Sequence, residues 1–168
     1  MPLDLSYIAD DTTVSDEEVI RAFGDLLYAM KQRQIIRTKN IVGELGERYC
    51  HMTFNGANEL PDLILEPTNS MDIDAKSDDG FTYSIKSVSA TSAKRTGSFH
   101  FSEEHDRLDK RFDYLLVCIL NDTMTLNSIY QFDWGLFWKL KSWSTTQKAW
   151  FLSLSKKNLV MADELFTQ

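Results

Sequence analysis

The stretch FDYLLVCIL, residues 112–120, constrains the fold more than any other part of the chain. Every position in it except Asp113 is apolar, so apolar and polar residues do not alternate. The run is too short to cross a bilayer, which takes about 20 residues. A short apolar run of this kind is typical of a central strand that other elements cover on both faces. The chain is therefore predicted to form an α/β or α+β domain.

Two amphipathic helices are predicted before this strand. A capping box begins at Ser15, and apolar residues recur at helical spacing over about 15–34. The second helix is predicted to begin near Thr38 or Asn40 and to run to about Met52. Helices in this position can cover one face of the sheet to which the central strand belongs.

After the second helix the apolar period changes to two, which indicates strands. These elements predict an α/β fold, and a mixed sheet of about five strands flanked by helices is what the family resemblance described below implies. The charged segment 102–111 is predicted to be a helix or an ordered loop. The other predicted elements are strands at 60–67, 71–76, 81–88 and 126–132, a short helix at 134–141, a strand at 148–155 and a closing helix or turn at 158–166.

Length, charge and cysteine content narrow the class of protein. The chain has 168 residues, which favours one domain, 1–168, with its own core. Its net charge of −7 argues against a surface that binds nucleic acid everywhere but allows a local basic groove. The first residues lack the basic and apolar regions of a secretory signal, so a cytoplasmic location is expected. Cys50 and Cys118 lie in apolar contexts, which favours buried free thiols over a disulfide.

The stretch MDIDAKSDDGFTYSIKS predicts a hairpin whose three-residue loop ends at Gly80. This loop length places the apolar side chains on one face and Asp72, Asp74, Ser84 and Lys86 on the other. One interpretation of the polar face is a solvated surface with weak ion pairs. The other is a magnesium site with a lysine beside it that orients or activates a water molecule.

The second predicted helix carries two glycines beside a glutamate. In IVGELGERY the apolar stripe lies on one side, and Gly43, Gly46 and Glu47 lie on the other. Each glycine inside a helix costs about 1 kcal/mol relative to alanine. The pair therefore predicts that something approaches this backbone closely. A packing contact, a sheet edge and a bound phosphate are the alternatives.

Three short motifs on these elements carry a resemblance to a known family. They are GELGE (43–47), DIDA (72–75) and YSIKS (83–87), and the apolar strand FDYLLV (112–117) follows them. In this order they resemble the PD-(D/E)-x-K nuclease superfamily, which has the restriction-endonuclease-like fold. The resemblance covers about 38–132, and it implies a mixed sheet with the active site beside the lysine strand.

The resemblance also implies roles for individual residues. Lys86 matches the superfamily lysine, and Asp74 matches the metal-binding aspartate, with Asp72 as the alternative. Glu47 matches the helix glutamate that many members add to the site. Asp62, which follows a proline, ranks third among the aspartates because it lies farther from the lysine and leads into an apolar strand.

One position departs from the family pattern. Ser84 stands two residues before the lysine, where the family usually has an acidic residue. A serine hydroxyl is a weaker magnesium ligand than a carboxylate. Two hypotheses follow: the chain is an inactive relative, or Glu47 or Asp72 supplies the carboxylate that Ser84 lacks.

The function implied by the resemblance is a Mg²⁺-dependent endonuclease that hydrolyses double-stranded DNA. A type II restriction endonuclease or a related phage-defence nuclease is the specific expectation. Lys94 and Arg95, with Thr91 and Ser92, are the predicted phosphate contacts, although their loop is equally typical of a flexible soluble segment. A homodimer is expected, because two symmetric sites can cut two strands.

The elements that could join such a dimer are the first helix and the tryptophan-rich C-terminal tail, although aromatic residues at this density are also typical of a core. The alternative function is a nuclease-fold protein without catalysis that binds nucleic acid or regulates another protein. A third hypothesis is an unrelated α+β domain in which the charges of the hairpin are solvated. A structure that placed Glu47 far from Lys86 would favour the third.

Overall fold

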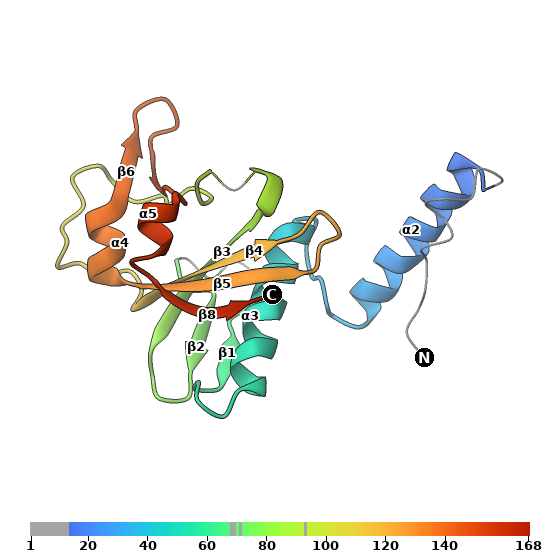
Figure 1. The fold of residues 1–168 in the computed structure, drawn as a ribbon, viewed down its shortest axis with the longest axis horizontal. Helices are drawn as coiled ribbons and strands as arrows, with labels where there is room; N and C mark the ends of the chain where they lie inside the picture. Colours follow the sequence, from blue (N-terminus) through green and yellow to red (C-terminus); the bar gives the residue numbers. More distant parts are fainter. Residues whose placement is uncertain (1–13, 68–69, 71, 93) are drawn as a thin grey trace. The chain divides into compact units, whose positions relative to one another are not determined.

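The computed structural model describes residues 14–168 except 68–69, 71 and 93, and it leaves out the side chain of Ser92. The chain divides into two compact units, Met1–Arg37 and Thr38–Gln168. In the first unit the described element is α2, Asp16–Gln32 (Figure 1). Its capping box is formed as predicted, with Ser15 and Glu18 each accepting a hydrogen bond from the other's backbone N–H. The predicted first helix is confirmed.

The second unit is built on a six-stranded sheet in the order β1-β2-β3-β4-β5-β8 (Figure 1). β3 and β4 pair in parallel and all other neighbours pair antiparallel, so the sheet is mixed. The predicted α/β class with a mixed sheet is confirmed, with one strand more than expected. The strands are β1 (Leu63–Leu65), β2 (Ala75–Ser77), β3 (Thr82–Ser89), β4 (Tyr114–Leu120), β5 (Leu126–Asp133) and β8 (Asp163–Thr167).

Strand β4 is central and covered on both faces, as its composition predicted. Its side chains alternate between two hydrophobic clusters, one on each face of the sheet. Leu115, Val117 and Ile119 belong to the first cluster, with aromatic residues of the C-terminal third. The residues between them join the second cluster, with Cys50 and Phe54 of the helix α3. Because β4 contributes side chains to a hydrophobic cluster on each face of the sheet, its sequence does not alternate between apolar and polar residues.

The helix α3, Ile41–Gly56, lies along one face of the sheet and packs on β3 and β4 (Figure 1). It begins where predicted, because the Asn40 side chain accepts a hydrogen bond from the N–H of Gly43. It ends later than predicted, at Gly56, since Phe54 continues the apolar stripe into the core. Cys50 and Cys118 are buried free thiols, as predicted. A hydrogen bond with Cys118 and burial together raise the pKa of Cys50.

The C-terminal third covers the other face of the sheet. Its elements are α4 (Trp134–Leu140), the β6–β7 hairpin (Lys141–Ser144 and Ala149–Leu152) and the short α5 (Lys156–Leu159). Trp134 is buried in the first cluster, and Trp138 and Trp150 pack against it. The tryptophan-rich tail therefore contributes to the core.

The structure differs from the predicted elements at two places and settles an alternative at a third. The closing segment was expected to be a helix or turn, but Asp163–Thr167 is the edge strand β8. Leu165 packs on the second cluster while its neighbours along the strand stay exposed, which is the pattern of an edge strand. The strand β6 was not predicted. The segment 102–111 is an ordered loop rather than a helix.

The helices within the described residues include none that is both long enough and apolar enough to cross a membrane.

Candidate active site beside strand β3

The hairpin has the register that its predicted loop requires. Ala75 lies opposite Tyr83, and Gly80 adopts a φ of +93° in the loop. The predicted pairing does not extend to Asp72, which has a φ of +65° and lies outside β2. Its carboxylate instead forms an ion pair with Arg111 at 3.5 Å. The prediction that Asp72 shares a site with Asp74 and Lys86 is therefore wrong, because Asp72 pairs with Arg111 and does not line the pocket of those two residues.

Asp74 marks the point at which β2 stops pairing with β3. Its N–H donates to the carbonyl of Tyr83 at 2.8 Å. Its carboxylate oxygen Oδ2 accepts two hydrogen bonds, from the N–H of Ile85 at 2.6 Å and from the hydroxyl of Ser84 at 3.2 Å. Both bonds end on the same oxygen. This arrangement fixes the carboxylate and leaves Oδ1 as the oxygen available for a ligand.

Ser84 holds Asp74 in this position. Its side chain is only 1% exposed, and its hydroxyl donates to Asp74. A buried hydroxyl that is used in this way orients a neighbouring carboxylate and does not replace one. The serine therefore adds a support for Asp74 where the family usually has an additional acidic side chain.

Three of the predicted site residues line one pocket of about 310 Å³. Glu47 comes from α3, Asp74 from the end of β2, and Lys86 from β3. The structure thus brings together residues that are 27 and 12 positions apart in the sequence. The other lining residues are Asn40, Gly43, Ile85, Ser87, Gly97 and Ser98.

The stem of Lys86 is held by neighbouring groups. Its ammonium lies 5.2 Å from the centre of the Phe99 ring, and Phe99 is buried. On the other side its Cδ would lie 3.8 Å from a Cβ added at Gly97. Lys86 thus lies between Phe99 and Gly97 and lines the pocket together with Asp74.

The predicted close approach to the second helix is present at Gly46. A Cβ at this position would lie 1.7 Å from the Oγ of Ser87, so the backbone of α3 rests directly on β3. The Oγ of Ser87 is buried and has no hydrogen-bond partner among the described residues. Gly43 has a local cause, since a Cβ there would meet the capping side chain of Asn40 at 2.3 Å. The close approach at Gly46 holds α3 against β3, and the next residue, Glu47, lines the same pocket as Lys86.

The donor set of the pocket fits Mg²⁺. This ion takes oxygen ligands, commonly one or two carboxylates, and completes its octahedron with water and substrate phosphate. Glu47 and Asp74 provide two carboxylates, and Lys86 provides a positive charge for a phosphate. Among the residues that the structure describes, no group of three His, Cys, Asp or Glu side chains forms a metal-binding cluster. The pocket therefore suits an ion shared with a phosphate more than an all-protein cage.

The loop with the predicted phosphate contacts is ordered against β7. Thr96 donates its N–H to the carbonyl of Leu152, and Leu154 donates to the carbonyl of Lys94. Lys94 is exposed, whereas the guanidinium of Arg95 lies 4.1 Å over the Phe151 ring. These hydrogen bonds hold the loop in place, and Gly97 and Ser98 at its C-terminal end line the pocket.

The remaining predicted residues are placed as follows. Thr91 hydrogen-bonds the Asp122 carboxylate at 3.0 Å, so an acidic group lies beside this hydroxyl. The side chain of Ser92 lies outside the described residues. Asp62 precedes β1 and does not line the pocket. Ser98 of the same serine-rich loop also lines the pocket, although it was not among the selected phosphate contacts.

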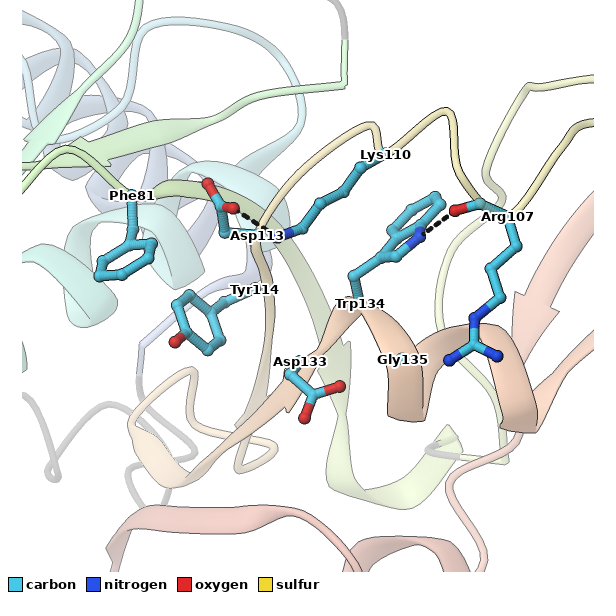
Figure 2. A pocket seen from close by; sticks show the side chains of 8 residues that line it. All are labelled: Phe81, Arg107, Lys110, Asp113, Tyr114, Asp133, Trp134 and Gly135. Atoms are coloured by element: carbon cyan, nitrogen blue, oxygen red, sulfur yellow. Dashed lines mark hydrogen bonds and ion pairs between the residues drawn. The ribbon is translucent and has the colours of Figure 1, made fainter.

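A second pocket of about 280 Å³ lies where β3 and β4 begin and β5 ends (Figure 2). Several of its polar groups bond within the protein. Lys110 donates to Asp113 at 2.6 Å, and the Trp134 indole donates to the carbonyl of Arg107 at 2.8 Å. The Asp133 carboxylate caps α4. The first two interactions anchor the loop 102–111 to the sheet, so these groups have a structural role.

Comparison with known proteins assigns no family to the chain. A scan finds no family model that matches it. A search of curated proteins finds no significant match either.

Proposed function

We propose that this protein is a Mg²⁺-dependent endonuclease that hydrolyses phosphodiester bonds in double-stranded DNA. The observation that supports the proposal is the convergence of Glu47, Asp74 and Lys86 on one pocket from three separate elements. These are the residues to which the resemblance to PD-(D/E)-x-K nucleases gives catalytic roles. A solvated hairpin face would not need a pocket that its lysine shares with a helix glutamate.

Each residue has a role that its surroundings allow. Glu47 and Asp74 would hold the ion, with Asp74 using Oδ1 because Oδ2 is occupied by Ile85 and Ser84. Mg²⁺ supplies Lewis acidity at the phosphate and lowers the pKa of bound water. The ammonium of Lys86 would orient the attacking water or offset the charge that develops on the phosphate. Ser84 acts as a positioning residue for Asp74.

The substrate and assembly belong to the same proposal. A type II restriction endonuclease or a related phage-defence nuclease fits a small domain with one site, which needs a second copy to cut the second strand. Lys94 is exposed on the loop that lines the pocket and is the proposed phosphate contact. Two buried free thiols fit a reducing cytoplasm.

One observation favours a second candidate function, a nuclease-fold protein that binds nucleic acid or regulates a partner without catalysis. Ser84 removes the usual third acidic side chain, which leaves Glu47 and Asp74 to hold an ion. If two carboxylates bind Mg²⁺ too weakly, DNA binding can persist without cleavage.

The deciding experiment uses the purified full chain. Supercoiled plasmid and a panel of phage genomic DNAs are incubated with Mg²⁺ or Mn²⁺, and cleavage is followed on gels. The variants Asp74→Asn and Lys86→Met are compared with Asp72→Asn, whose site faces Arg111 outside the pocket. Cleavage that is lost in the first two and kept in the control supports the nuclease. Binding of DNA without cleavage under every condition supports the second candidate.

A further inference from the structure

The helix α2 presents an apolar face to solvent. No residue in this 17-residue helix is buried. Ile20 is 70% exposed, Phe23 58%, Leu26 42% and Val19 39%. Burial of such apolar side chains away from water is favourable, so an exposed face of this composition marks an interaction surface.

The apolar residues have the spacing of a helix-pair seam. Val19, Phe23, Leu26 and Met30 follow one another at intervals of four, three and four, which are the a and d positions of a heptad repeat. Ile20, next to this seam, widens the stripe. A stripe of this spacing fits the matching stripe of another helix better than it fits a flat sheet.

The distribution of charge along α2 indicates which helix can pair with it. The first turn is acidic, with Asp16 and Glu18, and the end is basic, with Lys31 in the last turn and Arg33 at the C-cap. A second copy of α2 in the antiparallel orientation would bring opposite charges together at both ends. A parallel copy would bring like charges together, which is unfavourable.

A single register satisfies both the seam and the charges. With the twofold axis between Gly24 and Asp25, Phe23 of one copy lies opposite Leu26 of the other, and each Val19 lies opposite Met30. The same register places Asp16 opposite Arg33. We propose that α2 is a self-association element that pairs antiparallel with α2 of a second copy of this chain.

The expected affinity is modest. A helix of 17 residues is about 26 Å long and spans only about two and a half heptads. Short helices of this length are marginal alone, so pairing depends on protein concentration, with a Kd on the order of micromolar. The proposal stands independently of the nuclease function, although such a pair would supply the second active site that cutting two strands requires.

The test measures the mass of the full chain by analytical ultracentrifugation over a wide concentration range. We expect a monomer–dimer equilibrium that weakens with added salt. Phe23→Asp should shift it to monomer, with at least a tenfold rise in Kd. Tyr28→Asp is the matched control, because Tyr28 is 65% exposed and lies on the side of α2 away from the seam. A monomer at all concentrations, or equal dimerisation by the wild type and Phe23→Asp, would overturn the proposal.

The orientation has its own test. Arg33→Asp should weaken the dimer, and the exchange of charges in Asp16→Arg with Arg33→Asp should restore it. Spin labels at position 17 should lie about 22 Å apart along the axis in the antiparallel pair, since each residue rises 1.5 Å. Labels in close contact would show a parallel pair and overturn the assignment. A wild-type protein that cleaves DNA but does not self-associate would contradict this proposal alone. A protein that dimerises but does not cleave DNA would contradict only the proposed nuclease function.

Discussion

The carboxylates of the two pockets, one beside the middle of β3 and the other where β3 begins, are held in different ways. Around Arg107 and Asp133, the ion pair, the indole bond and the helix cap each join protein to protein. In the pocket of Glu47 and Lys86, the fixed bonds of Asp74 fall on one oxygen and leave the other available. The comparison shows that the number of charged residues lining a pocket does not identify a functional site. What matters is which atoms of each charged group are already bonded within the protein.

Replacing the pocket lysine by methionine should change DNA cleavage far more at Lys86 than at Lys110. Lys86→Met should lower the rate of DNA cleavage about 100-fold or more, because it removes a charge that stabilises the phosphate as it reacts. Its melting temperature should stay close to that of the wild type. Initial cleavage rates in saturating Mg²⁺ measure the effect. If Lys86→Met cleaves at the wild-type rate, the difference between the pockets has no catalytic meaning.

The contact between α3 and β3 can be broken at Gly46. Gly46→Ala should lower the free energy of unfolding by about 1–3 kcal/mol, since its Cβ would overlap Ser87 and force the helix away from the strand. Cleavage should fall too, because Glu47 moves with the helix. Urea unfolding and cleavage rates measure the two effects.

A double variant and a control on the same helix sharpen this result. Ser87→Gly removes the side chain that the new methyl group meets, so it should recover most of the loss in Gly46→Ala. Gly56→Ala, which meets nothing within 4 Å, should leave both stability and cleavage nearly unchanged. Helix propensity alone favours alanine over glycine. Equal losses in Gly46→Ala and Gly56→Ala would therefore show that the contact with Ser87 is not the cause.

In the structural pocket the largest effect is expected at Asp113. Burial by itself raises the pKa of this carboxyl, but hydrogen bonds from Lys110 and Thr82 outweigh it and the pKa is lowered from 3.8. A lowered carboxyl pKa stabilises the fold above the unfolded-state pKa, and this stability is lost as the pH falls through 3.8 and below. Asp113→Asn should therefore lose about 1–2 kcal/mol at neutral pH and show a flatter acid dependence. Unfolding measured from pH 7 to pH 3 tests both points, and a parallel shift of the two curves would contradict them.

Local patterns explain why much of the fold was predictable. The unbroken apolar run of β4 and the loop length of the hairpin each report their own surroundings, so the central strand and the Ala75–Tyr83 register follow from a few neighbouring residues. Asp74 and Lys86 follow from the same register. Glu47 was identified because two helix glycines beside it required a close contact, which is present at Gly46.

The predictions that needed correction depend on contacts distant in sequence. Asp72 pairs with Arg111, which is 39 positions away in the sequence, and a local alternating pattern carries no information about so distant a partner. The strand β8 forms because the edge of β5 is available to it. Both the Asp72–Arg111 ion pair and the pairing of β8 depend on the assembled sheet, so a local pattern does not reveal them.

Lys110→Met should have the smallest effect, and it completes the comparison with Lys86→Met. The Lys110 side chain is 48% exposed, so solvent screens its ion pair with Asp113 and the loss of stability should be only about 0.5 kcal/mol. Cleavage per folded molecule should match the wild type, because the ammonium fastens a loop and contacts no proposed substrate group. Cleavage rates and urea unfolding of the two methionine variants, measured side by side, provide the check. A Lys110→Met protein that folds normally but no longer cuts DNA would give the second pocket a functional role and reverse the assignment argued from its hydrogen bonds.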